Sequence, residues 1–236
     1  MDNIFYNNLQ STHLEDNQTT LLIDIYHQQQ GQKNITLDAH AKLDYICVIK
    51  QSDIELNITT KGEYAQSTVH VIVLSKDQQK SKVTCISTLQ HSNTQANMSI
   101  TSFVGEWWDI EIIGGIKIQT DIQQVQAHLT EKNIILGQNL RCKVLPMLDV
   151  QSNDVSASHG ATIDQINAEH LFYLTAKGLH SSLARQLIIQ SYINTIFDPI
   201  LQTNPQKINQ IKQNILADII NDKTKDDSNN NLDIGK

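Results

Sequence analysis

From Thr19 to about residue 150 the sequence alternates between apolar and polar side chains with a period of two. The alternation comes in runs of about five to eight residues, rich in Val, Ile and Thr, which polar residues or glycine separate. One run reads TLLIDIY and another reads STVHVIVL. Helical periodicity is nearly absent from the same stretch. The chain therefore has to fold around many short β-strands.

The spacing of these runs limits how the strands connect. Successive runs start about ten residues apart, and every second run recurs after about twenty. Both a sandwich and a solenoid fit this spacing. Hardly any connection carries the Asn-Gly or Asp-Gly pair of a tight hairpin, which favours a solenoid whose coils supply two or three strands each. The last strands of the series are expected at Trp107 to Ile113, Gly115 to Thr120, Val125 to Leu129, Asn133 to Leu136 and Cys142 to Leu148.

Changes of composition divide the chain into four parts. Residues 1–18 are polar apart from Ile4-Phe5-Tyr6, and they are expected to form an N-terminal arm that is loose or holds a short helix. A β core is expected over residues 19–166 and a helical domain over residues 167–221. Residues 222–236 are rich in Asp, Lys and Asn, which predicts a disordered tail.

The helical part carries recognisable start and stop signals. Asn167 is expected to cap a helix over Ala168 to Lys177, and Gly178 follows as a residue that tolerates the left-handed conformation. Ser181 is expected to cap a second helix, and a third helix is expected to start at Pro205.

The second of these helices has apolar residues at three- and four-residue spacing. Such a stripe either packs within the domain or binds a partner protein in a groove. The residues predicted to bind a partner are Leu183, Leu187, Ile188, Tyr192 and Ile196.

Charge and hydropathy exclude several classes of partner. The net charge is −7, and no basic patch interleaved with aromatic residues is present, so nucleic-acid binding is not expected. The longest apolar run is too short to insert into a membrane. The first residues, MDNIFYNNLQ, do not resemble a secretory signal, and a cytoplasmic location is expected.

The three cysteines are few and widely spaced, which argues against a disulfide framework and against a structural zinc site. Cys47 and Cys85 lie within alternating strands, where a buried and unreactive thiol is the common outcome. Cys142 lies between Arg141 and Lys143, which would lower the pKa of its thiol if the thiol is exposed.

The sharpest candidate for site chemistry is His159, which stands between Ser158 and Gly160 and is expected in a polar surface turn. A neutral imidazole is a good ligand for iron, zinc or copper. The alternative is a histidine that only forms a hydrogen bond at the turn.

Enzymatic signatures are weak. Asp109 and Glu111 alternate along one strand, and with Trp107 and Trp108 they offer a carbohydrate-active site as an alternative. The pair Gly114-Gly115 lacks the lysine and the spacing of a phosphate-binding loop, and no G-x-S-x-G motif is present.

Ordered motifs in the last third of the chain resemble the SufB/SufD family, the scaffold subunits of the Suf iron–sulfur cluster assembly system. The resemblance is specific from about residue 144 to residue 196 and extends loosely back to about residue 110. The motifs are Pro146-Met-Leu-Asp-Val, Asn153-Asp154-Val155, Ser158-His159-Gly160-Ala161-Thr162, Leu171-Phe172-Tyr173-Leu174, Gly178-Leu179 and Ala184-Arg185.

The resemblance implies a mainly β fold: a right-handed parallel β-helix followed by a small helical C-terminal domain. It also implies that the C-terminal helices dock a SufC-type ABC ATPase, and that two scaffold chains pair through their β-helices. The second chain would be a SufB-type subunit or another copy of this one.

Comparison within the family favours the SufD type. Where SufB has a glutamate directly after the histidine, this chain has Gly160. Where SufB has the cysteine thought to receive sulfur, this chain has Lys132, and Ala157 replaces a cysteine that is frequent in SufD. His159 is therefore left as the candidate ligand for a transient iron–sulfur cluster, bound only together with a partner subunit. The resemblance implies a scaffold that is not an enzyme, and a structural adaptor without cluster chemistry is the alternative.

Overall fold

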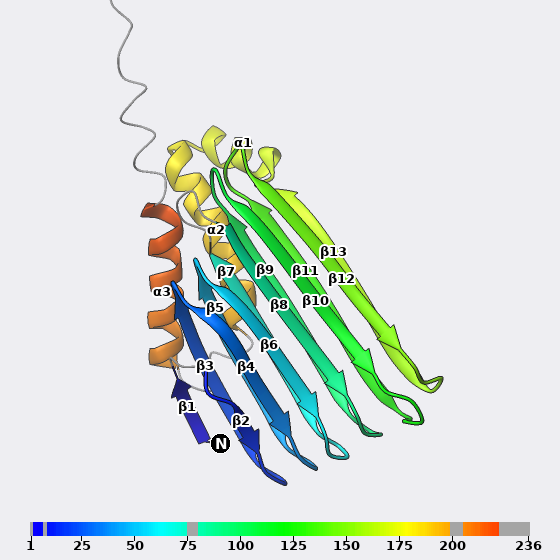
Figure 1. The fold of residues 1–236 in the computed structure, drawn as a ribbon. Helices are drawn as coiled ribbons and strands as arrows, with labels where there is room; N and C mark the ends of the chain where they lie inside the picture. The colour runs from blue at the N-terminus through cyan, green and yellow to red at the C-terminus, as the bar shows by residue number, and fades with distance from the viewer. Residues whose placement is uncertain (1, 7–8, 75–79, 199–204, 222–236) are drawn as a thin grey trace, which may run out of the picture. The chain divides into compact units, whose positions relative to one another are not determined.

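The structure is a computed structural model that describes residues 2–6, 9–74, 80–198 and 205–221. It divides into two compact units, residues 1–163 and 164–236. Thirteen strands are described, nearly all of them in the first unit, and three helices in the second (Figure 1). The strands are β1 (Asp2–Tyr6), β2 (Thr12–Leu14), β3 (Thr19–His27), β4 (Gln30–Leu37), β5 (Lys42–Lys50), β6 (Asp53–Thr60), β7 (Gln66–Leu74), β8 (Lys80–Leu89), β9 (Gln95–Val104), β10 (Asp109–Ile118), β11 (Val125–Ile135), β12 (Arg141–Val150) and β13 (Val155–Gln165).

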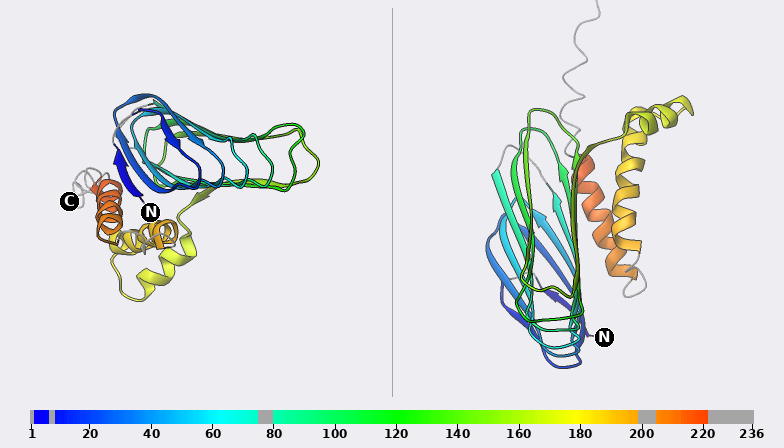
Figure 2. Two further views of the ribbon diagram at one scale, coloured as in Figure 1. Left: turned by 90° about the horizontal axis from the view of Figure 1, so that it is seen from below. Right: turned by 90° about the vertical axis from the view of Figure 1, so that its right-hand side faces the viewer.

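The strands alternate between two parallel sheets. One sheet has the order β1-β3-β5-β7-β9-β11-β13 and the other the order β12-β10-β8-β6-β4-β2. Each strand therefore pairs with the strand two places along the chain, and each coil of the chain supplies one strand to each sheet (Figure 2). This is a two-sided parallel β-helix, which confirms the solenoid prediction.

The prediction of an N-terminal arm over residues 1–18 was wrong in its secondary structure. β1 pairs with β3, and β2 pairs with β4, so this segment contributes a strand to each sheet. Both strands are short edge strands, of five and three residues, so neither is long enough to show the period-two alternation of the later strands.

The corners between strands use left-handed residues other than glycine. Asn17, His40, Tyr64 and Asn93 all have φ near +60° and occupy the same corner of successive coils. The Asn17 N–H donates to the Ala39 carbonyl, so neighbouring corners are linked by hydrogen bonds. The solenoid climbs through these bends, which explains why the sequence lacks hairpin signals.

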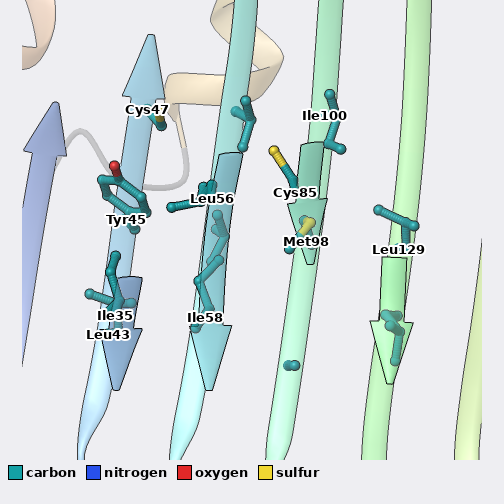
Figure 3. Close-up of a cluster of buried hydrophobic side chains, with 14 of the residues drawn as sticks. Ile35, Leu43, Tyr45, Cys47, Leu56, Ile58, Cys85, Met98, Ile100 and Leu129 are labelled. Carbon is teal, nitrogen blue, oxygen red and sulfur yellow. The ribbon is translucent and has the colours of Figure 1, made fainter. Parts of the chain in front are cut away.

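The core fills the space between the two sheets. Inward side chains of the two sheets interleave, among them Tyr45, Leu56, Cys85, Ile100 and Leu129 (Figure 3). Aliphatic residues dominate this core, and many of them are the Val and Ile residues of the alternating runs.

One buried ion pair interrupts this apolar interior. The Lys33 ammonium and the Asp24 carboxylate are 3.7 Å apart, and both side chains are fully buried. The hydroxyls of Tyr26 and Tyr45 donate to the same Asp24 oxygen, at 3.1 and 2.8 Å. Burial raises the pKa of Asp24, while Lys33 and the two hydroxyls oppose that rise.

The second unit holds helices α1 (Ala168–Ala176), α2 (Ser181–Phe197) and α3 (Pro205–Asn221). The Asn167 side chain accepts hydrogen bonds from the N–H groups of Glu169 and His170, which confirms the predicted cap. Gly178 has φ +93°, as expected after the first helix.

The cap of the second helix is His180, whose ring accepts from the Ser182 N–H, and not Ser181. No helix within the described ranges is long and apolar enough to cross a membrane. The tail predicted over residues 222–236 lies outside the described residues.

Candidate functional site

The last coil of the β-helix is open. Within the described residues β12 is hydrogen-bonded only to β10, and β13 only to β11. Leu148 and Val150 are in register with the buried residues Ile116 and Ile118, so they point toward the interior, yet they are 37% and 38% exposed. Ile163 of β13 is 55% exposed. Among the described strands, none adds a further coil over these apolar side chains.

His159 lies on this open end, in the middle of β13 and exposed. Side chains alternate along a strand, so His159 shares a face with Val155 and Ala157, which pack against the core. The prediction of a surface turn at His159 was therefore wrong. The turn precedes the strand, at Asn153-Asp154, and the polar composition of β13 reflects its position at the sheet edge.

Side chains of β11 hold β13 in place on both sides of His159. The His128 Nδ1 and the Ser158 Oγ are 2.8 Å apart. The Asn133 amide donates to the Thr162 carbonyl at 3.0 Å and accepts from the Ser102 hydroxyl at 2.7 Å. Asn133 is fully buried and links β9, β11 and β13, so the edge strand is fixed to the sheet beneath it.

Glu131 lies in the interior one coil below this edge strand. It is 1% exposed, and its carboxylate lies against Gly114 of the opposite sheet. Neither oxygen accepts a hydrogen bond of ordinary geometry from the described residues. Burial raises the pKa of Glu131 to about 7, and the Gly114 backbone only partly opposes the rise. Sequence reasoning missed this residue, although a glutamate at an inward position of the alternation was a signal.

The cysteines do not join His159. Cys47 and Cys85 are fully buried, as predicted, and burial raises the pKa of both thiols. Cys142 is half-buried, and burial raises the pKa of its thiol to about 11. The condition set for activation of Cys142, an exposed thiol, is not met, because the thiol packs toward the core while Arg141 and Lys143 point to the other face of β12. Among the described residues no three His, Cys, Asp or Glu side chains gather into a metal site.

The residues proposed for a carbohydrate site do not form one. Asp109 and Glu111 share the outer face of β10, but each has a lysine partner, Lys80 at 3.7 Å and Lys143 at 3.0 Å. Trp107 is 56% exposed and Trp108 is buried in the core, so the two rings do not line one groove.

In the helical unit the predicted partner-binding stripe is divided. Leu183 and Leu187 are exposed, Ile188 is buried, and Tyr192 and Ile196 are half-buried. The helix α2 contacts both α1 and α3, so its apolar residues point in more than one direction. Phe172 and Tyr173 of α1 are among the most exposed large apolar residues described. They belong to a family motif in the sequence but were not among the residues predicted to bind a partner.

Residues 10–192 match the SufBD core domain of the SUF system for iron–sulfur cluster assembly. The chain belongs to the SufBD family. This confirms the resemblance found in the sequence and makes a carbohydrate-active enzyme the wrong alternative.

Named relatives share modest identity with the chain. It is 27% identical over 151 residues to an iron–sulfur cluster assembly SufBD family protein of Synechocystis. The match covers 64% of this chain and 33% of the relative. It is 28% identical over 106 residues to the iron–sulfur cluster assembly protein SufD of Escherichia coli, covering 45% of this chain and 24% of SufD. A match to the chloroplastic protein ABCI7 of Arabidopsis thaliana, 24% identical, covers 77% of this chain and 42% of the relative. The matches thus span less than half the length of these relatives.

Proposed function

We propose that this SufBD family chain is a SufD-like scaffold component that assembles iron–sulfur clusters together with a second scaffold chain. The open end of the β-helix is the observation that carries the proposal. A solenoid normally needs a polar cap at each end, because its interior is apolar. Here Leu148, Val150 and Ile163 are left exposed, and a second chain of the same fold would cover them.

The edges of the open end favour β13 as the strand that pairs. In β12, Pro146 lacks an N–H and cannot donate to an added strand. β13 contains no proline and no lysine or arginine, the residues that commonly block an edge strand. A strand of the second chain can therefore add to β13, and apolar burial of the inward residues would stabilise the pair at about 25 cal/mol per Å².

Pairing would place His159 inside the interface. A neutral imidazole there can bind iron of the nascent cluster, which is the cargo of the scaffold. Because no three donors gather in the described residues, the other ligands would come from the second chain. The chain would thus hold the cluster transiently and perform no catalysis of its own. The proposed second chain is a SufB-type subunit. It would supply the cysteine and the glutamate that this chain lacks, because Lys132 and Gly160 stand at those two positions here.

The helical unit is the proposed docking site for a SufC-type ATPase. The exposed apolar residues Phe172, Tyr173, Leu183 and Leu187 lie on α1 and α2, which contact one another. A monomeric surface rarely leaves several large apolar side chains exposed within one small helical unit. The cytoplasm remains the expected location.

The test is reconstitution with SufB-type and SufC-type proteins. His159→Ala is expected to lower cluster yield while the complex still forms. His91→Ala, an exposed histidine in a turn between β8 and β9, is the matched control. Ile163→Asp is expected to abolish pairing of the scaffold chains, and Leu187→Glu to abolish only the ATPase contact. Unchanged cluster yield with His159→Ala would reject His159 as a ligand and favour a structural adaptor without cluster chemistry. Unchanged pairing of the scaffold chains with Ile163→Asp would reject the open end as the interface.

A further inference from the structure

An apolar patch lies on the outer face of the sheet that ends in β12. Leu145 and Met147 of β12 point outward and are exposed. Ile113 of β10 is in register with Leu145 and is half-buried. Ile86 of β8 and Met147 both lie against Gly115, since a β carbon there would meet Ile86 Cδ1 at 2.6 Å and Met147 Cβ at 3.5 Å. The apolar surface is therefore continuous across these strands, and a continuous exposed patch commonly marks an interaction site.

A row of charged residues borders this outer-face patch on each side. In the first row, the Lys143 ammonium of β12 is 3.0 Å from the Glu111 carboxylate of β10. In the second row, Asp149 of β12 is in register with Lys117 of β10. Each row holds one cation and one anion, but their order is reversed. β12 carries the cation of the first row and the anion of the second.

This reversed order makes the surface complementary to a second copy of itself. A two-fold axis that crosses the strands between the two apolar rows would place β10 against β10 of the copy, and β12 against β12, with the strands antiparallel. Lys143 would then face Asp149 of the copy, and Glu111 would face Lys117 of the copy. Leu145 would face Met147 of the copy in the centre. Opposite charges would thus meet on both sides of an apolar middle.

The same arrangement avoids repulsion. Lys82 of β8, which is in register with Glu111, would face the uncharged Thr88 of the copy. Within these four described rows of β8, β10 and β12, no like charges would face each other. A closed two-fold interface uses the same patch on both partners, so it requires a pattern that is its own complement when read in reverse. Complementary charges of this kind select the partner and fix its register.

We propose that the outer-face patch is a self-association surface through which two copies of this chain pack face to face. Sheets that pack in this way lie about 10 Å apart, so the side chains of the two patches would interdigitate. The patch is separate from the open end, which exposes the inward residues of β12 and the free edge of β13. Self-association therefore goes beyond the proposed function and does not depend on it.

The experiment is sedimentation velocity of the full chain, without partner proteins, over a series of concentrations. Met147→Asp would bury an unpaired charge in the centre of the interface, and it is expected to weaken self-association by about tenfold or more. The matched control is Glu55→Lys on the outer face of β6, an exposed position beyond the patch, and it is expected to leave self-association unchanged. Thermal unfolding of each variant verifies that it is folded.

A sharper test exchanges the charges of one row at a time. Glu111→Lys combined with Lys143→Glu keeps an ion pair within the first row but makes like charges face each other between the copies. Lys117→Asp combined with Asp149→Lys does the same from the second row. Each double variant alone is expected to stay monomeric where the unchanged chain associates. An equimolar mixture of the two is expected to associate, because opposite charges face each other again, and a folding defect cannot produce this rescue.

Three results would overturn the inference: an unchanged chain that stays monomeric over the whole series, a Met147→Asp variant that associates as the unchanged chain does, or row variants whose mixture stays monomeric. Ile163→Asp at the open end separates this surface from the proposed function. If Ile163→Asp abolishes self-association and Met147→Asp does not, copies pair through the open end, and the outer-face patch is rejected while the proposed function stands.

Discussion

The carboxylate of Glu131 lies against Gly114, on the facing strand of the opposite sheet, in space that any larger residue at position 114 would fill. Glu131 belongs to β11 and Gly114 to β10 of the opposite sheet. The glycine has no side chain, and the acidic side chain of Glu131 fills the space between the two sheets at this point. This relationship yields two predictions, one for each partner.

Gly114→Ala is expected to destabilise the fold. The added methyl group would overlap the Glu131 carboxylate and approach Ile100 Cδ1 to 3.0 Å, and overpacking of this kind costs about 1–3 kcal/mol. Denaturant unfolding measures the change. The control is Gly160→Ala in β13, where a β carbon meets nothing within 4 Å, and its effect is expected to stay within about 0.5 kcal/mol. Equal effects at both glycines would contradict the packing seen here.

Glu131→Gln is expected to remove a pH dependence of stability. The pKa of Glu131 is raised from 4.5 to about 7 in the folded state. The folded state therefore binds the proton more tightly than the unfolded state. Stability is greatest below pH 4.5, falls as the pH rises to about 7, and is then constant.

The full effect is about 3 kcal/mol, at roughly 1.4 kcal/mol for each pKa unit. The variant should match the unchanged chain at acidic pH and exceed it above neutrality. Urea unfolding at a series of pH values measures the difference, and a constant difference across the series would show that Glu131 does not titrate in this range.

Lys33→Met is expected to be among the most damaging conservative changes in the β-helix. It leaves the Asp24 carboxylate buried with only the tyrosine hydroxyls to stabilise its charge, and breaking a buried pair costs about 3–5 kcal/mol. Lys143→Met breaks an ion pair with Glu111 on the partly exposed outer face, and should cost at most about 1 kcal/mol. Thermal unfolding of both variants makes the comparison, and similar losses would show that burial does not decide the strength of the pair.

Asn133→Ala is expected to loosen the edge strand that carries His159. The substitution removes the hydrogen bonds to the Ser102 hydroxyl and to the Thr162 carbonyl, and leaving buried partners unsatisfied costs about 1–3 kcal/mol. Amide hydrogen exchange should accelerate most in β13, around Thr162. The control Asn57→Ala removes a hydrogen bond to Asn34 on the outer face of β6 and should leave exchange in β13 unchanged. Uniform acceleration over the whole β-helix would indicate global destabilisation.

The sequence alone determined the class of fold. Period-two alternation, β-branched residues and missing hairpin signals were sufficient to predict a strand-rich solenoid, because these are local properties of the chain. The N-cap at Asn167 and the left-handed residue at Gly178 were also predictable, since each depends on only a few neighbouring residues. The family motifs around His159 led to the correct family for the same reason, because they are read in sequence order.

Tertiary structure decided what these local signals left open. Gly114 was taken as a boundary between two strands, whereas it lies within the single strand β10. A glycine fits at this position because the Glu131 carboxylate, 17 residues later in the chain, occupies the space of its side chain. The predicted stripe on α2 is divided between exposed and buried residues, because two neighbouring helices, α1 and α3, determine which of its faces are buried. Alternation shows that a strand has two faces but not what lies opposite each residue. The offset between coils and the facing of the two sheets bring Lys33 to Asp24 and Glu131 to Gly114, and those long-range contacts are set by the packing of the whole β-helix.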